Sequence, residues 1–175
     1  KGSAQALLGK VYLYQDKNAK AAEQLSEVNG TPGGTSKYGY KLLASFNDLW
    51  ETTNTYNTEA IIEIAHTDKS NAGWGNWGWG DDEGNSLNIM VGPRSYSRPV
   101  GSTAPDYVSG WSFSIVTQGL YDVLNGDPRF DATILDMKAL KASGQVDYVP
   151  GYQDTGYFLK KFMPLNSETS TGGGD

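Results

Sequence analysis

The chain has 175 residues, of which 20 are acidic and 14 are basic, so its formal net charge is -6 at pH 7. An acidic chain is repelled by phosphate backbones, which argues against nucleic acid as a partner. The absence of cysteine excludes disulfides, thiol chemistry and cysteine-based zinc sites. The length allows one domain with a substantial core. The sequence contains no run of about 18 apolar residues, so no membrane span is predicted.

Residues 1–30 are predicted to form two paired helices. The spacing Leu8-Gly9-x2-Tyr12, followed by Ala21-x3-Leu25, is most of a tetratricopeptide unit, in which a small residue lets two helices approach closely. One such pair cannot bury its own apolar faces, so a true repeat implies stacked neighbours. The alternative is a plain helical hairpin inside a helical domain.

The 3.6-residue period of apolar residues predicts which helix faces are buried. Asn18 is expected to cap the second helix, and Gly30 is expected to end it. Apolar residues recur with this period at Ala4, Leu7, Leu8 and Val11 in the first helix. In the second helix, Ala22, Leu25 and Val28 are expected to line the inner face.

The next segment is predicted to hold one helix and one strand. Apolar residues from Leu42 to Trp50 recur on one face of a helix, which makes Trp50 a core residue. Residues 59–65 have the β-branched content of a short strand. His66, the only histidine, follows directly, and we assign it no chemical role because no second ligand or nucleophile is near it in sequence.

Residues 71–85 have an unusual composition, with three tryptophans in six residues, each next to glycine. Such a stretch is not typical of an amphipathic helix or a central strand. In one interpretation the indoles pack together under a long loop. In the other, at least one indole is exposed as a stacking surface for a ligand. Between Lys69 and Arg94 there are three acids and no base, so a neutral sugar suits this stretch better than an anionic ligand.

Indole faces stack on sugar C–H faces, while Asn and Asp side chains bond hydroxyls. The candidate carbohydrate-binding residues are therefore Trp74, Asn76, Trp77, Trp79, Asp81, Asp82 and Tyr96. Adjacent acids in a glycine-rich loop are interpreted as solvated; they are not spaced as a calcium loop or as a glycosidase pair. No catalytic residue, metal or cofactor is expected.

The last third of the chain shows short elements. Residues 117–124 predict a helix that buries Leu120, Val123 and Leu124, and Asn125-Gly126 is expected to stop it with a left-handed residue. Asp127-Pro128-Arg129 predicts a turn in which Arg129 pairs with a carboxylate, either Asp131 or a distant one. Short strands are expected within residues 134–135, 146–149 and 156–162.

In order and spacing, these motifs resemble the SusD/RagB family of outer-membrane nutrient-binding lipoproteins of Bacteroidetes. The matching motifs are Ala4-x2-Leu7-Leu8-Gly9-x-Val11-Tyr12, Lys37-Tyr38-Gly39-Tyr40 to Phe46-x2-Leu49-Trp50, Asn57-x-Glu59-x-Ile61-Ile62-Glu63-Ile64, and Leu120-x2-Val123-Leu124-x2-Asp127-Pro128-Arg129 with Tyr157-x2-Lys160-Lys161-Phe162.

The resemblance implies a mainly α fold: tetratricopeptide-like helix pairs with a loop-rich half that contains a few short strands. The 175 residues are then one internal portion of a SusD-like domain. Its parts are a helix pair (1–34), a helix with a short strand (35–65) and a loop-rich ligand-binding region (66–175).

The resemblance also implies a function. Such proteins bind oligosaccharides without catalysis at the cell surface and deliver them to a SusC-like TonB-dependent outer-membrane transporter. They contact the membrane only through a lipid anchor, which would lie outside this segment. The alternative is a peptide-binding or transporter-capping tetratricopeptide scaffold for nutrient import. A glycoside hydrolase fragment is a third hypothesis, which would require two separated carboxylates.

Overall fold

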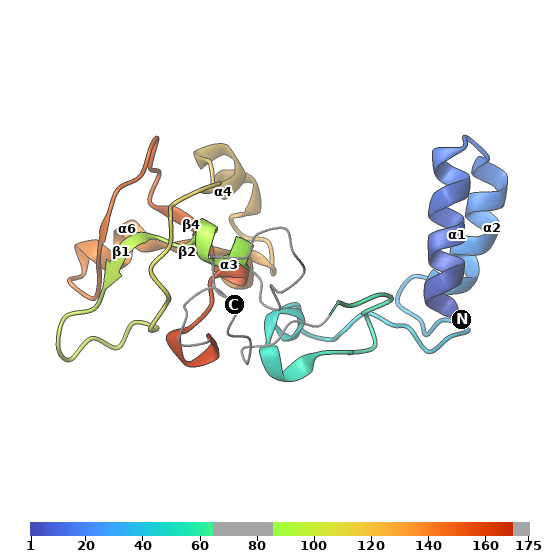
Figure 1. Cartoon of the computed structure of the whole chain (residues 1–175), viewed down its shortest axis with the longest axis horizontal. Helices are drawn as coiled ribbons and strands as arrows, with labels where there is room; N and C mark the ends of the chain where they lie inside the picture. Colours follow the sequence, from blue (N-terminus) through green and yellow to red (C-terminus); the bar gives the residue numbers. More distant parts are fainter. Residues whose placement is uncertain (65–85, 170–175) are drawn as a thin grey trace, which may run out of the picture. The chain divides into compact units, whose positions relative to one another are not determined.

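The structure is a computed structural model that describes residues 1–64 and 86–169 (Figure 1). The chain divides into two compact units, Lys1–Ala65 and His66–Asp175. That residues 1–175 form one internal portion of a single domain stays a prediction.

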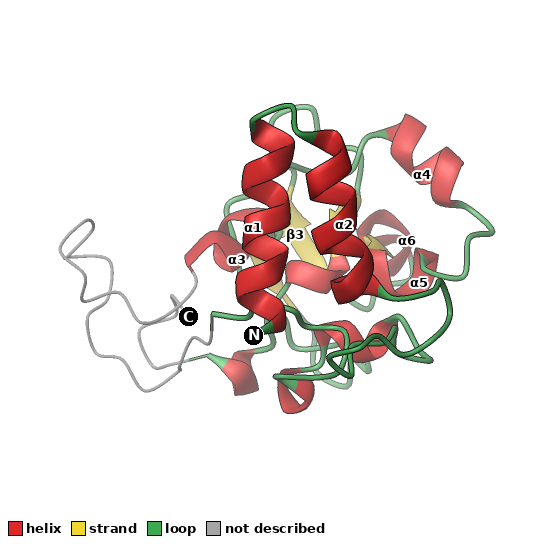
Figure 2. Ribbon diagram, turned by 90° about the vertical axis from the view of Figure 1, so that its right-hand side faces the viewer, coloured by secondary structure: helices red, strands yellow, loops and turns green. Residues whose placement is uncertain are grey.

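The first unit begins with the predicted helix pair. Helix α1 spans Gly2–Tyr14 and helix α2 spans Asn18–Asn29, and the two run side by side in opposite directions (Figure 2). Gly9 lies against α2 so closely that a methyl group there would come within 2.7 Å of the Leu25 side chain. Ala21 and Val28 are buried on the α2 side. The close approach therefore depends on the small residues that the repeat pattern indicated.

The predicted inner face of α2 is partly wrong. Leu25 is half-buried and Val28 is fully buried, but Ala22 is exposed because Ala21, one position away on the helix, takes the buried place. The apolar side chains of Ala4, Leu7, Leu8 and Val11 in α1 are exposed. The capping prediction is also wrong: Lys17 is the N-cap of α2, and it makes no side-chain cap hydrogen bond.

The chain after α2 folds back onto α1. The Ser36 hydroxyl accepts hydrogen bonds from the backbone N–H groups of Tyr38 and Tyr40 (3.3 and 3.1 Å). The Tyr38 hydroxyl bonds the Gln5 side chain, and Gly2 of α1 lies against the Tyr40 ring. These contacts hold residues 36–40 against the N-terminal half of α1.

The helix predicted for residues 42–50 is wrong. Only two short 3-10 helices form, Asn47–Trp50 and Thr52–Asn54. The Lys41 N–H donates to the Thr58 carbonyl (3.0 Å), and the Leu43 N–H donates to the Glu59 carboxylate (2.9 Å). These contacts with later residues take backbone N–H groups and keep the segment out of a continuous helix. Trp50 is half-buried and packs edge-to-face on Phe46, with ring centroids 5.8 Å apart.

The strand predicted for residues 59–65 is also absent over 59–64, where the chain makes turns and bends. The Asn57 side chain accepts from the N–H groups of Glu59 and Ala60 (2.9 and 3.2 Å), a local turn that competes with strand pairing. The Glu63 carboxylate accepts from the Tyr56 N–H. The Asn57 and Glu63 side chains therefore accept from backbone N–H groups that a neighbouring strand would otherwise bond.

The second unit contains short elements joined by long loops. Its helices are α3 (Ser86–Val91), α4 (Gln118–Leu124), α5 (Phe130–Thr133) and α6 (Met137–Ala142). Its strands are β1 (Arg94–Ser97), β2 (Ile134–Asp136), β3 (Asp147–Val149) and β4 (Tyr157–Leu159). Two 3-10 helices follow, Lys160–Phe162 and Asn166–Glu168.

The strands form two antiparallel two-stranded sheets, β1 with β3 and β2 with β4. In the second sheet Ile134 pairs with Leu159 and Asp136 with Tyr157. The strands expected within 134–135, 146–149 and 156–162 are therefore confirmed, whereas β1 and α6 were not predicted. The described residues confirm the fold class: a mainly helical chain with a few short strands in two small sheets.

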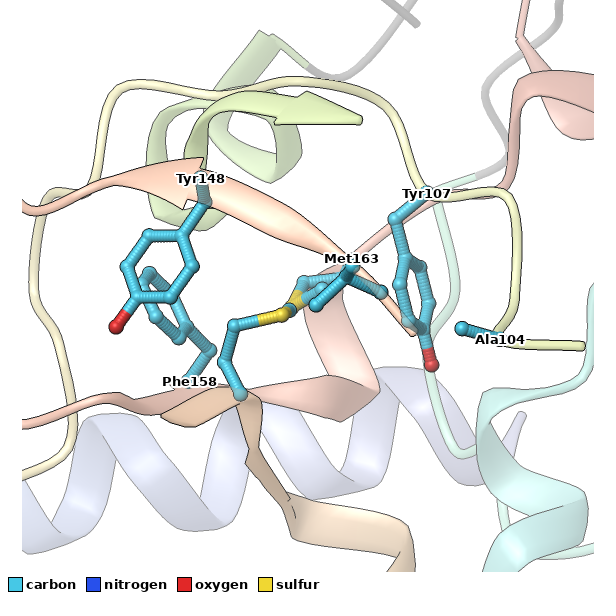
Figure 3. Packing of buried hydrophobic residues seen from close by; sticks show 7 residues of the cluster. Ala104, Tyr107, Tyr148, Phe158 and Met163 are labelled. Atoms are coloured by element: carbon cyan, nitrogen blue, oxygen red, sulfur yellow. The ribbon is translucent and has the colours of Figure 1, made fainter. Parts of the chain in front are cut away.

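The larger hydrophobic core of the second unit contains residues from strands β3 and β4, from helix α6 and from the loops. Figure 3 shows Tyr148 beside Phe158, and Met163 between that pair and Tyr107 with Ala104. Phe158 is fully buried and meets Tyr148 edge-to-face at 5.6 Å between ring centroids. A smaller cluster of Val116, Ile134 and Tyr157 packs against α4 and α5 through Tyr121, Leu124 and Phe130.

Helix α4 is confirmed, together with its stop signal. The Thr117 side chain accepts from the Leu120 N–H (3.2 Å) as an N-cap, and Gly126 has a φ of 87°. The predicted buried face is wrong for two of its three residues, since Leu120 and Val123 are exposed and Leu124 is half-buried. Tyr121 packs inward instead, stacked on Tyr157 at 4.0 Å.

Candidate functional site

Most of the predicted binding residues lie outside the part of the chain that the structure describes. They are Trp74, Asn76, Trp77, Trp79, Asp81 and Asp82, and His66 lies there too. Their role in ligand binding therefore stays a prediction. The described residues show which contacts hold the segment that directly follows this stretch.

Helix α3 follows the tryptophan-rich stretch directly, and a second segment pairs with its end. The backbone N–H groups of Trp111 and Phe113 donate to the carbonyls of Ile89 and Met90 (3.2 and 2.8 Å). The Gly110 N–H donates to Pro93 O (2.8 Å), and the Ser112 N–H donates to Gly92 O (2.8 Å). Four hydrogen bonds therefore anchor residues 89–93 to residues 110–113.

This anchor requires glycine at Gly110. A methyl group on Gly110 would lie 2.2 Å from the Ile89 carbonyl oxygen and 2.6 Å from the Gly92 Cα. Both neighbours are backbone atoms, which cannot rotate away as a side chain would. The two segments therefore approach as closely as their backbones allow.

Tyr96 is the one predicted site residue within the described part of the chain. It is half-buried on β1. Its hydroxyl donates to the Pro105 carbonyl (2.6 Å), and its ring meets Tyr107 edge-to-face at 6.0 Å. Burial raises the pKa of Tyr96, and it raises the pKa of Tyr107 to about 12. Both phenols are therefore neutral hydrogen-bonding groups at physiological pH.

A hollow of about 440 Å³ lies between the end of β1, α6 and the start of β3. It is lined by Ser97, Arg98, Pro99, Lys141, Gly144, Val146 and Asp147. The two cations are paired, Arg98 with Asp106 at 3.1 Å and Lys141 with Asp147 at 2.7 Å. The pairing leaves little net charge to attract an anion, and the hollow offers mainly hydrogen-bonding groups.

The Asp127-Pro128-Arg129 turn is held by its own ion pair. Arg129 donates from Nε and Nη2 to the two Asp127 carboxylate oxygens (2.8 and 2.7 Å). The partner predicted for Arg129, Asp131 or a distant carboxylate, is therefore wrong. The guanidinium lies closer to Asp127 because the tight turn folds the arginine back over it. These hydrogen bonds lower the pKa of Asp127 to about 2.

Two kinds of feature are absent from the residues that the structure describes. Within residues 1–64 and 86–169, no group of three His, Cys, Asp or Glu side chains is placed to hold a metal ion. None of the helices described is both long and apolar enough to cross a membrane.

Comparison with known proteins gives matches among solved structures. A "Laminarin binding SusD-like protein" is 60% identical over 99% of this chain, with a TM-score of 0.89. "Surface glycan-binding protein A from Bacteroides thetaiotaomicron in complex with laminarihexaose" is 25% identical over 98% of the chain, with a TM-score of 0.74. "Surface glycan-binding protein A from Bacteroides fluxus" is 27% identical over 91%, with a TM-score of 0.65.

No protein-family model matches the chain, and no curated protein does. The chain spans 38%, 37% and 31% of the lengths of those three solved structures, respectively. All three are named as binding proteins and not as enzymes. Because this chain is 60% identical to a SusD-like protein and matches its fold over 99% of the chain, it belongs to the SusD-like family.

Proposed function

We propose that this chain is part of a non-catalytic cell-surface protein that binds a neutral glycan, with β-glucans of the laminarin type as the first candidates. The observation that carries the proposal is the 60% identity to a laminarin-binding SusD-like protein. A complex of a second relative with laminarihexaose supports the same class of ligand.

The proposed ligand surface is the tryptophan-rich stretch, with Trp74, Trp77 and Trp79 stacking on sugar rings and Asn76, Asp81 and Asp82 bonding hydroxyls. Tyr96, which is half-buried, is retained as a contributor. The local charge supports a neutral ligand, because no basic residue occurs between Lys69 and Arg94. The anchored segment 89–93 would hold one end of this stretch in place.

The whole protein is proposed to sit at the outer-membrane surface as a lipoprotein and to deliver the glycan to a SusC-like TonB-dependent transporter. This part of the proposal rests on family membership. Co-purification of such a transporter with the tagged intact protein tests it. Recovery of the tagged protein without any transporter would contradict delivery while leaving glycan binding intact.

Native gel electrophoresis in gels that contain a neutral polysaccharide tests the binding itself. The intact protein is expected to migrate more slowly with laminarin than without it. A Trp74/Trp77/Trp79→Ala variant with an unchanged circular dichroism spectrum should lose the retardation. Retardation by no neutral polysaccharide would contradict the proposal and favour the peptide-binding scaffold.

A further inference from the structure

The hollow between the end of β1, α6 and the start of β3 has the size of a small-molecule site. Its volume of about 440 Å³ lies within the range of about 300–1,000 Å³ that such sites occupy. Four of its lining side chains are polar: Ser97, Arg98, Lys141 and Asp147. The remaining lining residues are glycine or aliphatic, so a ligand here would be held by hydrogen bonds and by contact with aliphatic carbon.

The wall that follows β1 is fixed by hydrogen bonds. Arg98 donates from Nη1 to the Ala104 carbonyl (2.7 Å), and its Nε lies 3.1 Å from Asp106 Oδ1. The Ser102 hydroxyl donates to the Gln145 carbonyl (2.6 Å), which ties the same loop to the segment after α6. This wall is therefore preformed, and a ligand that binds against it orders little further chain.

The opposite wall is fixed by Lys141. Its Nζ donates to the Tyr148 carbonyl (3.0 Å) and lies 2.7 Å from Asp147 Oδ1, which also accepts from the Tyr148 N–H (2.8 Å). The hydrogen bond from Lys141, followed by that from the backbone, lowers the pKa of Asp147. Asp147 is therefore a carboxylate at neutral pH, and it offsets the charge of Lys141 as Asp106 offsets that of Arg98. A neutral ligand suits such a lining better than an anion.

The lining side chains keep hydrogen-bonding capacity that the protein does not use. Within residues 1–64 and 86–169, the Ser97 hydroxyl, Arg98 Nη2 and Asp147 Oδ2 have no hydrogen-bond partner. Ser97 is exposed, and the Asp147 side chain is 71% exposed. A hydroxyl donates and accepts, a guanidinium donates and a carboxylate accepts. Adjacent sugar hydroxyls, which both donate and accept, match this combination.

The aliphatic part of the lining completes the match to a sugar. Val146 is 4% exposed and borders the hollow together with the Pro99 ring. These groups can contact the C–H groups of a pyranose ring while its hydroxyls meet the polar side chains. Gly144 also borders the hollow, and a methyl group there would meet no atom within 4 Å. The space beside Gly144 is therefore open to a ligand.

We infer that this hollow binds one hexose ring of the neutral glycan through hydrogen bonds with Ser97, Arg98 and Asp147, without aromatic stacking. This inference rests on the proposed function and adds a second contact for the glycan, separate in sequence from Trp74, Trp77 and Trp79.

Methyl NMR of the intact protein, with isotope-labelled valine, tests the inference during titration with laminarihexaose. The Val146 methyl signals should shift saturably, because Val146 lines the hollow. Those of Val28, which is fully buried in the other unit, should stay unshifted. Ser97→Ala removes a hydroxyl without a partner among the described residues. It should raise the Kd of the Val146 titration about fivefold while leaving the melting temperature unchanged.

Gly144→Asn tests the hollow by filling it. Gly144 has a φ of 75°, which asparagine tolerates, and the added side chain would occupy space that borders the hollow, so the Val146 shift should disappear. Gly126→Asn is the matched control. Gly126 has a φ of 87°, an added methyl group would meet no atom within 4 Å, and it does not line the hollow. This variant should titrate as the unsubstituted protein does.

Unshifted Val146 signals during binding that calorimetry detects would overturn the subsite while the proposed function stood. An unaltered Val146 titration in Gly144→Asn would do the same, because the shift would then arise elsewhere. A Val146 shift caused by glucuronic acid and by no neutral sugar would overturn the neutral ring as the ligand of the hollow. Absence of both shift and heat with every neutral glycan would overturn the subsite and the proposed function together.

Discussion

Gly110→Ala should disrupt the anchor between residues 89–93 and 110–113. A methyl group at this position would lie 2.2 Å from the Ile89 carbonyl oxygen, whereas ordinary contacts begin near 3.4 Å, so the two segments must separate by about 1.2 Å (3.4 minus 2.2). The four hydrogen bonds between them measure 2.8 to 3.2 Å, and this shift would lengthen them to about 4 Å, beyond bonding distance.

At about 1 kcal/mol for each hydrogen bond, the free energy of unfolding should fall by about 4 kcal/mol, within a range of about 2–6. Urea unfolding of the intact protein, followed by circular dichroism, measures this change. Affinity for laminarin should fall as well, because the anchor holds the segment that follows the proposed ligand surface.

Gly119→Ala is the matched control for that substitution. Gly119 lies in the first turn of α4, and a methyl group there would meet no atom within 4 Å. Alanine should leave stability unchanged or raise it by up to about 1 kcal/mol, since it favours the helix. Equal stabilities of the Gly110→Ala and Gly119→Ala variants would refute the reasoning about close backbone approach.

Three further substitutions test the packing, the caps and the electrostatics of the second unit. Phe158→Ala removes a fully buried ring and should cost about 3–5 kcal/mol in urea unfolding; a loss below about 1 kcal/mol would show that this core is not cooperative. Thr117→Ala removes the N-cap of α4 and should cost about 1 kcal/mol, whereas Thr117→Ser should retain most of it, and equal losses in both would argue against capping. Asp127→Asn removes the carboxylate whose pKa Arg129 lowers to about 2 from an ordinary 3.8. Because the folded pKa is the lower one, the unsubstituted protein should be the more stable at neutral pH, and its advantage should disappear as pH falls from about 4 to about 2; a difference that is constant with pH would contradict the ion pair.

Local signals in the sequence predicted the elements that are held by local contacts. The α1–α2 pair follows from Gly9 and Ala21, which let two helices approach. Helix α4 begins at the Thr117 cap and ends before Gly126, where the backbone is left-handed. The signals of α4 lie close together in the sequence, and those of the α1–α2 pair follow the spacing of a known helical repeat, so spacing indicates both.

The failures have different causes, and in one of them a distant residue competes for a backbone group. Leu42 to Trp50 has a helical period, but the Leu43 N–H bonds the Glu59 carboxylate across 16 residues. Helix α6 was missed although Asp136 caps it by accepting from the Ala139 N–H (2.9 Å). It has only six residues, too few for a hydrophobic period to show.

The sequence predicted the candidate site only from its amino-acid composition, without its geometry. The tryptophan-rich stretch suggested a sugar ligand through its residue types and its lack of bases. The hydrogen bonds that hold the segment after it join residues 89–93 to residues 110–113, which are far apart in the sequence, so no local spacing indicates them.

The central claim, that the protein binds a neutral glycan, is tested most directly by titrating the intact protein with laminarihexaose at two salt concentrations. Saturable binding is expected, with a Kd that changes little between about 0.05 and about 0.5 M salt, because a neutral ligand is not screened. Heat and fluorescence signals indistinguishable from buffer, for laminarihexaose and for other neutral oligosaccharides, would contradict the account.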